Sequence, residues 1–250
     1  MLTVVLIGTG GSEGVPVPGC SCPACNEARH YRFLRRSTAS LLITNYSMNM
    51  LVDMSLDASY RVEELYVGAV LVTHWHHDHI AGLYKFRWSE TPIDLYAPRG
   101  SADPEIVHFP RSLRIHFVKP FEELYVGDFK VTTLKLNHTV ETLGYLVELG
   151  RNTVAVLFDT KGLPSETLEF LKKRRVSLAL VDATYKPGYE GEKHNNVDEA
   201  VEIGKDIGAE EVVLTHISHH NLPYSRLVKY VRERWRNVYV SYDGMIVNLI

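Results

Sequence analysis

Cysteine is scarce in this chain, and so are the features of membrane proteins and of proteins that coat nucleic acid. The 250 residues include only 3 cysteines, Cys20, Cys22 and Cys25, and an odd, clustered set cannot form a disulfide framework. No apolar run approaches the roughly 20 residues that span a bilayer. Lysine and arginine total 27 against 30 aspartate and glutamate residues, which argues against a nucleic-acid partner but allows a local basic patch.

The N-terminal stretch MLTVVLIGTGG has no basic region and runs directly into glycines, so it predicts a first strand and not a targeting segment. With clustered thiols and no spanning segment, we expect a cytoplasmic protein that has no membrane partner. Hydrophobic residues make up 45% of the chain, which is enough for a core. The length fits one α/β unit, so we expect a single domain over residues 1–250.

Short apolar runs bounded by turn residues predict most of the secondary structure as strands. The predicted strands are Leu2–Ile7, Ser40–Thr44, Asn49–Val52, Ala69–Thr73, Ile93–Tyr96, Phe129–Leu136, Gly144–Glu148, Thr153–Phe158, Leu178–Val181 and Glu211–Leu214, with a hairpin turn at 148–152. Helical periodicity falls mainly between the later strands, at Ser165–Lys173, Val197–Ile207 and Tyr224–Trp235. Many strands with helices added late predict two packed sheets with helices outside, in four layers.

The chain has 12 histidines, and several of them lie in a segment where four side chains that can bind a metal follow one predicted strand. His74, His76, Asp78 and His79 come directly after Ala69–Thr73, where alternate residues of one loop could serve two adjacent metals. Imidazole and carboxylate ligands suit borderline divalent metals such as zinc or manganese. A polar, histidine-rich surface loop is the alternative interpretation.

Three further candidates stand just beyond the ends of other predicted strands. They are His138, Asp159 and His216. The carboxyl ends of strands are the edge where open sheets build their sites. One such residue is usually a cap, but four strand ends that finish in ligand residues favour a metal centre.

The cysteine cluster predicts a second, structural site. Cys20-x-Cys22-x-x-Cys25 supplies three thiolates, and a closed zinc site needs a fourth ligand, for which His30, His219 and His220 are candidates. Three thiols without metal are the alternative. The neighbouring loop Gly8-Thr-Gly-Gly-Ser-Glu-Gly14 lacks the spacing of both the dinucleotide-binding and P-loop motifs, so we expect close backbone packing beside the metal site instead.

Taken together, His74-x-His76-x-Asp78-His79, His138, Asp159 and His216 resemble the signature of the metallo-β-lactamase superfamily. The resemblance implies the α/β, four-layer αββα sandwich. It also implies that His74, His76 and His138 hold one metal, that Asp78, His79 and His216 hold a second, and that Asp159 bridges both.

Within that superfamily, the CxCxxC segment after LIGTGGSEGVPVPGC is similar to PhnP-type phosphodiesterases, as are the stretches at 82–88, 136–146 and 214–219. The similarity implies that His219 completes the structural zinc and that His194 is a general acid, although a simple loop histidine is the rival interpretation. Asp78 would additionally orient the nucleophile.

The implied activity is that of a metal-dependent phosphoric diester hydrolase with two active-site metals, zinc or manganese, and one structural zinc. Its substrate would be a small cyclic phosphate. The resemblance favours 5-phosphoribosyl 1,2-cyclic phosphate, giving ribose 1,5-bisphosphate, and 2′,3′-cyclic nucleotides are further expected substrates. A hydroxide that bridges the two metals would attack phosphorus. The alternatives are a tRNase Z-like endoribonuclease, a glyoxalase II-like thioesterase and a non-enzymatic zinc-binding module. The sequence leaves open whether the protein is a monomer or a homodimer.

Overall fold

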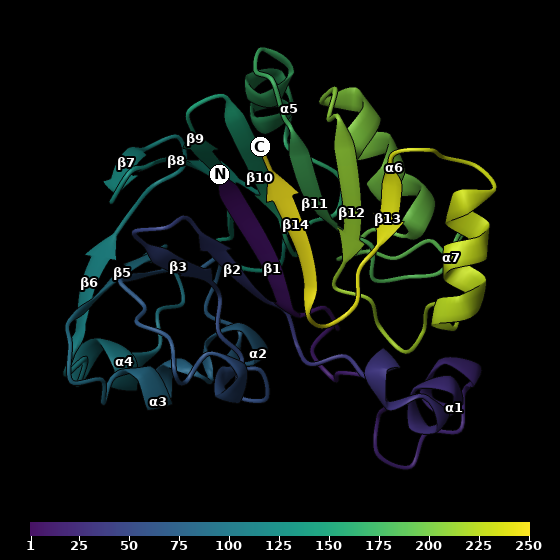
Figure 1. Ribbon diagram of the computed structural model, residues 1–250, viewed down its shortest axis with the longest axis horizontal. Helices are drawn as coiled ribbons and strands as arrows, with labels where there is room; N and C mark the ends of the chain where they lie inside the picture. The colour runs from purple at the N-terminus through teal and green to yellow at the C-terminus, as the bar shows by residue number, and fades with distance from the viewer.

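The computed structural model describes all residues from Met1 to Ile250, and most of them belong to two seven-stranded sheets (Figure 1). The strands are β1 (Leu2–Gly8), β2 (Ser40–Thr44), β3 (Asn49–Val52), β4 (Ala69–Leu71), β5 (Ile93–Ala97), β6 (Leu113–Phe117), β7 (Glu123–Val126), β8 (Phe129–Lys135), β9 (Leu143–Leu149), β10 (Asn152–Leu157), β11 (Leu178–Asp182), β12 (Glu211–Thr215), β13 (Val238–Val240) and β14 (Met245–Leu249). The helices are α1 (Pro23–His30), α2 (His77–Ile80), α3 (Leu83–Phe86), α4 (Pro104–His108), α5 (Ser165–Lys172), α6 (Val197–Asp206) and α7 (Tyr224–Arg232).

The two sheets pack face to face and confirm the predicted αββα sandwich. The first has the order β14-β1-β2-β3-β4-β5-β6, and the second has the order β13-β12-β11-β10-β9-β8-β7. One hydrophobic core lies between the sheets, a second lies under α5, α6 and α7, and a third lies under α2, α3 and α4. Figure 1 shows these two helix groups on opposite outer faces and α1 below the sandwich, near α7. None of the helices is long and apolar enough to cross a membrane.

Central strands are buried on both faces, which explains why they have continuous apolar sequences. Every residue of β11 is buried, as are four of the five residues of β2. In β12, four of five residues are buried and β13 pairs with it in parallel. The predicted hairpin turn is confirmed, because Asn152 of β10 pairs with Leu149 of β9 in an antiparallel register.

The four strands that were not predicted from the sequence are the edge strands of the two sheets. β6, β7, β13 and β14 each have a strand neighbour on one side only, and they carry exposed residues along their length. An edge strand contacts the core less, so its apolar pattern is weaker. The four short helices α1 to α4 precede the later strands, so the expectation that helices come mainly late was incomplete.

The parallel strands set the place of the site. β3 and β4 run parallel in the first sheet, and β10, β11 and β12 run parallel in the second. Their carboxyl ends therefore lie at one edge of the sandwich, and the loops that follow them carry the predicted ligand residues.

Candidate metal centres

The structure brings all seven predicted active-site ligands together from loops of both sheets. His74, His76, Asp78 and His79 follow β4, whereas His138, Asp159 and His216 follow β8, β10 and β12. Their donor atoms lie within 4.8 Å of one another in overlapping groups, which are His74, His76 and His138; His74, His79 and Asp159; and Asp78, His79 and His216. This edge of the sandwich could therefore hold two adjacent metal ions.

Asp159 stands between the two groups and presents one carboxylate oxygen to each. Its Oδ1 lies 3.4 Å from His79 Nε2 and 3.3 Å from His216 Nε2. Its Oδ2 lies 3.8 Å from His74 Nε2 and 3.7 Å from His138 Nε2. This is the position that a ligand shared by two metals must take.

Three of the donor atoms that converge here have no hydrogen-bond partner in the protein. They are His79 Nε2, Asp159 Oδ1 and His216 Nε2, and all three are buried. His74 Nε2 faces His76 Nδ1 at 2.8 Å, so two ring nitrogens point at the same space. Unpaired buried polar atoms are costly, and cations bound between them would satisfy them. The residues present thus fit divalent metals with nitrogen and oxygen ligands.

A buried carboxylate orients the two histidines on the first sheet. Asp53 Oδ2 accepts from His79 Nδ1 at 2.7 Å and from the hydroxyl of Thr73 at 2.7 Å. Because that hydroxyl has given its one proton to Asp53, the Nδ1 of His74, 2.9 Å away, must be the donor to Thr73 Oγ1. Both rings therefore donate from Nδ1 to the protein, so Nε2 is the nitrogen that each ring can offer to a metal.

The second sheet repeats this arrangement. Asp182 Oδ1 accepts from the backbone N–H and the hydroxyl of Thr184, and Thr184 Oγ1 lies 2.8 Å from His216 Nδ1. His216 must then donate through Nδ1, which frees its Nε2. Asp53 and Asp182 were not among the residues predicted from the sequence. Both stand at strand ends, so the signal that found Asp159 could have found them as well.

Three site residues have a backbone conformation that non-glycine residues rarely adopt. The φ angles are 54° for Asp53, 50° for Asp159 and 56° for His216. Such left-handed residues cost free energy and cluster at functional sites, where the surrounding structure fixes them. Each lies within two residues of the end of a strand, so the turn points its side chain across the sheet edge.

The carboxylates of the site favour positive charge within it. Burial disfavours the imidazolium of His79, but the charges of Asp159 and Asp53 outweigh burial and raise the pKa of His79 well above its ordinary value. Burial and the neighbouring His79 lower the pKa of His74. Without a metal, the site thus holds a proton where a metal would bind, and metal binding must release it.

His194, the predicted general acid, lies beside both ligand groups. Its ring centroid is 5.0 Å from that of His138 and 5.0 Å from that of His216, on which it stacks at 14°. Its Nδ1 is 2.7 Å from Asp182 Oδ2, and its side chain is 15% exposed. Burial alone would lower its pKa, but the hydrogen bond and charge of Asp182 raise the pKa of His194 to about 9. It is therefore a protonated group that reaches both the site and solvent.

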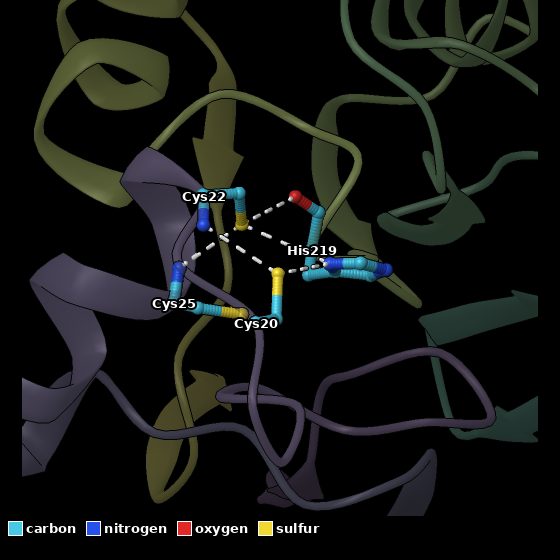
Figure 2. A group of neighbouring side chains, drawn as sticks. All are labelled: Cys20, Cys22, Cys25 and His219. Carbon is cyan, nitrogen blue, oxygen red and sulfur yellow. Dashed lines mark hydrogen bonds between the residues drawn. The ribbon is translucent and has the colours of Figure 1, made fainter.

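The cysteine cluster forms a separate, four-ligand group. Figure 2 shows the sulfurs of Cys20, Cys22 and Cys25 turned toward one another and toward His219. His219 Nδ1 lies 3.4 Å from Cys20 Sγ and 3.7 Å from Cys22 Sγ. Of the other two candidates for fourth ligand, His220 packs against His219, with ring centroids 3.9 Å apart and ring planes tilted by 46°, and His30 ends α1.

Backbone N–H groups further prepare this cluster for thiolates. Cys20 Sγ accepts from Cys22 N, Cys22 Sγ accepts from Cys25 N, and Cys25 Sγ accepts from Val17 N. Burial raises the pKa of the Cys25 thiol to about 12, so the cluster needs a cation to become three thiolates. Three sulfurs and one ring nitrogen are the donor set of a closed zinc site.

The glycine-rich loop has the close backbone packing that the sequence predicted. A Cβ on Gly8 would lie 1.9 Å from the carbonyl oxygen of Thr38, and a Cβ on Gly11 would contact the His216 ring at 3.5 Å. Glu13 of the same loop accepts from the Ser218 hydroxyl at 2.6 Å and from His219 N at 3.2 Å. This loop thereby joins the cysteine cluster to the loop that carries His216.

Two mixed sheets between helices, with ligand groups at the strand ends, define the metallo-β-lactamase fold class. A family model described as the beta-lactamase superfamily domain matches residues 49–217. Because this match covers more than half of the chain, the protein belongs to the beta-lactamase superfamily.

Three similar proteins extend this result. The chain is 28% identical over 221 residues to the probable metallo-hydrolase YhfI of Bacillus subtilis, which covers 82% of this chain and 87% of that protein. It is 31% identical over 262 residues to an octanoyltransferase of Porphyromonas gingivalis, covering 96% of this chain but only half of that protein's length. Its fold matches the crystal structure of a diphosphatase from the PhnP family with a TM-score of 0.85, at 24% identity, over 100% of this chain and 98% of that one.

The role of Asp53 can be tested by removing its charge. We expect Asp53→Asn to weaken metal binding or activity by about 10- to 100-fold, because losing an outer partner of ligand histidines has costs of that order. Metal titration of the variant measures the effect, with Asp206→Asn, an exposed carboxylate at the end of α6, as the control. Wild-type metal affinity and activity in Asp53→Asn would contradict the role.

The assignment of the cysteine cluster as a zinc site can be tested by substituting its ligands and, as a control, the neighbouring His220. We expect His219→Ala and Cys22→Ser to lose about one zinc per chain and to unfold at lower temperature, because a structural zinc contributes directly to folding free energy. His220→Ala is the matched control and should keep its zinc. Unchanged zinc content of Cys22→Ser by mass spectrometry would refute the assignment.

Proposed function

We propose that the protein is a metal-dependent phosphoric diester hydrolase that acts on small cyclic phosphodiesters. The observation that carries this proposal is Asp159, whose two oxygens face two separate groups of ligand nitrogens. Membership of the beta-lactamase superfamily and similarity to a probable metallo-hydrolase and a diphosphatase support a hydrolytic reaction. The fold itself does not choose the substrate, so the choice rests on the site.

In this proposal, His74, His76, His138 and Asp159 hold one divalent metal, zinc or manganese, and Asp78, His79, His216 and Asp159 hold the other. Bound there, two metals would supply an acidified water and positive charge for the phosphate oxygens. Asp78 is half-buried, and its Oδ2 lies 3.3 Å from His79 Nε2. The other carboxylate oxygen of Asp78 is then available to orient the attacking water.

His194 protonates the departing ribose oxygen. Because Nδ1 is committed to Asp182, the proton that leaves comes from Nε2. An alkoxide is a poor leaving group, so a positioned acid accelerates its departure. After transfer, the charge of Asp182 favours the return of the proton to the ring, which restores His194 for the next cycle.

A pocket beside Asp78 bears on the choice between the two candidate substrates. It has a volume of about 640 Å³, and Glu13, Asp57 and Asp78 line it without any lysine or arginine. A second phosphate would be repelled there. We therefore place 2′,3′-cyclic nucleotides ahead of 5-phosphoribosyl 1,2-cyclic phosphate as substrates, although the sequence alone favours the latter.

The decisive assay offers both cyclic phosphates to the metal-loaded protein and measures release of phosphomonoester. We expect turnover of both, with kcat/KM for the nucleotide higher by about 10-fold because one charge repulsion at this range is worth about 1 kcal/mol or more. A precursor tRNA and a glutathione thioester serve as comparison substrates for the endoribonuclease and thioesterase alternatives. No phosphomonoester from either cyclic phosphate would reject the proposed function.

A further inference from the structure

Helix α7 and the residues after it are strongly basic, although the chain as a whole carries a net charge of −3. Between positions 224 and 236 there is one acidic residue, Glu233, against five basic ones, all exposed, which are Arg226, Lys229, Arg232, Arg234 and Arg236. Lys229 and Arg234 both lie within 4 Å of Glu233. Arg226, Arg232 and Arg236 make no ion pair with any acidic side chain, so their charges are free for a ligand.

A groove runs along this basic segment, between α7, β13 and the turn that leads to β14. Its volume is about 330 Å³, and its walls carry four aromatic side chains, Tyr224, Trp235, Tyr239 and Tyr242, together with Arg232 and Arg236. Tyr239 is 41% exposed and Tyr242 is 42% exposed. Aliphatic side chains of α7 and β13 form the floor, and no acidic residue lines the groove.

The groove is independent of the metal centres. None of its lining residues belongs to the ligand groups, and Figure 1 shows α7 beside β13, the edge strand of the second sheet. Whatever binds there need not be the compound that the proposed hydrolase cleaves. Binding in this groove is therefore independent of the proposed hydrolysis.

The combination of planar side chains with guanidinium groups that make no ion pair restricts the class of ligand that the groove can bind. Aromatic faces stack on nucleobases, and arginine binds phosphates at the same time, which is how proteins hold single strands without reading sequence. A free phosphate would leave the aromatic walls unused, and an acidic peptide would have no planar group to place on them. We propose that the groove between α7 and β13 binds single-stranded nucleic acid, with bases on Tyr239 and Tyr242 and phosphates on Arg232 and Arg236.

This proposal revises the expectation, drawn from net charge, that the protein has no nucleic-acid partner. Net charge averages over the surface and cannot show that positive side chains gather on one helix face. Arg226, Lys229 and Arg232 recur every three residues, so they form one exposed stripe opposite the buried Leu227 and Val231. Such a stripe is a local electrostatic footprint for a polyanion.

Fluorescence anisotropy with a short labelled oligouridylate and the full-length, metal-loaded protein tests the proposal at low salt. We expect a dissociation constant below about 100 µM, and weaker binding of a duplex of equal length because its bases are already stacked. Arg232→Glu/Arg236→Glu should weaken binding by at least about 10-fold and lower the slope of log affinity against log salt by about 2. The matched control is Lys172→Glu/Lys173→Glu at the end of α5, which should bind as the wild type does.

A second variant separates stacking from charge. Tyr239→Ala should weaken binding by about 5-fold or more, whereas Tyr239→Phe, which keeps the ring, should bind normally. Hydrolysis and metal content should not change in any of these variants, which also shows that they fold.

Four results would overturn the proposal. They are a dissociation constant above about 100 µM for the oligouridylate, equal loss of binding in the α5 control, and anionic phospholipid vesicles that bind as well as RNA and do so without Tyr239. The fourth is a homodimer in sedimentation experiments that Arg232→Glu/Arg236→Glu dissociates, because the groove would then be an interface between copies.

Discussion

The Asp159→Asn variant is expected to lose at least about 10³-fold of the proposed phosphodiesterase activity, more than the 10- to 100-fold typical of losing an outer partner of a ligand. Asp159 is the only ligand residue that faces both groups, with Oδ1 toward His79 and His216 and Oδ2 toward His74 and His138. An amide keeps the size of the side chain but removes its charge, and its NH₂ end has no lone pair for a metal. Both proposed metal positions are affected by this one change.

The measurement compares kcat/KM of Asp159→Asn with that of Asp206→Asn, an exposed carboxylate at the end of α6, at saturating metal. Circular dichroism and thermal unfolding of the metal-free proteins show whether the fold is kept. If Asp159→Asn retains activity within about 10-fold of the control, Asp159 does not bridge two metals and the proposed ligand set is wrong.

The second large effect concerns His194 and depends on the leaving group. We expect His194→Ala to slow hydrolysis of a 2′,3′-cyclic nucleotide by about 10²- to 10⁴-fold, which is the usual contribution of a general acid. The same variant should slow hydrolysis of bis(p-nitrophenyl) phosphate far less, because nitrophenolate departs without a proton. Metal content should stay at the wild-type level.

Two outcomes would contradict this role for His194. An equal loss on both substrates would mean that the ring does not deliver a proton to the leaving oxygen. Loss of metal from His194→Ala would mean that His194 is a metal ligand and not an acid. The geometry allows this alternative, because His138, Asp159 and His194 also place their donor atoms within 4.8 Å of one another.

The sequence was sufficient to predict the interior of the fold and not its edges. All ten predicted strands are present, and their residues are buried on both faces or pair on both sides. The missed strands β6, β7, β13 and β14 are the outermost strand at each end of both sheets. Their residues alternate with exposed positions or span only three or four residues, so a pattern that depends on burial could not detect them.

The same contrast holds for the site. Ligand residues could be predicted because parallel strands bring their carboxyl ends to one edge, so strand-end His and Asp residues gather there. Asp53 and Asp182 stand at the same edge, but their partners Thr73, His79, Thr184 and His194 become evident only from the hydrogen bonds. The choice of His219 over His30 and His220 depended on family resemblance, since sequence distance alone favours His30.

The arginine-bearing groove could not be predicted at all from composition. Tyr239 and Tyr242 lie on an unpredicted edge strand and the turn after it, and α7 was predicted mainly from its apolar stripe. Only the fold places that strand beside the helix and so brings aromatic and basic side chains to one groove.

One chain is proposed to hold two adjacent metals at the sandwich edge and a separate zinc in the cysteine cluster, and the number of metals bound per chain tests both sites at once. Mass spectrometry of the native protein, with the bound metals counted, should give three per chain. His74→Ala/His79→Ala should retain one, and Cys22→Ser should retain two. A native protein that binds one metal, or a Cys22→Ser variant that loses all of them together, would contradict two independent metal sites.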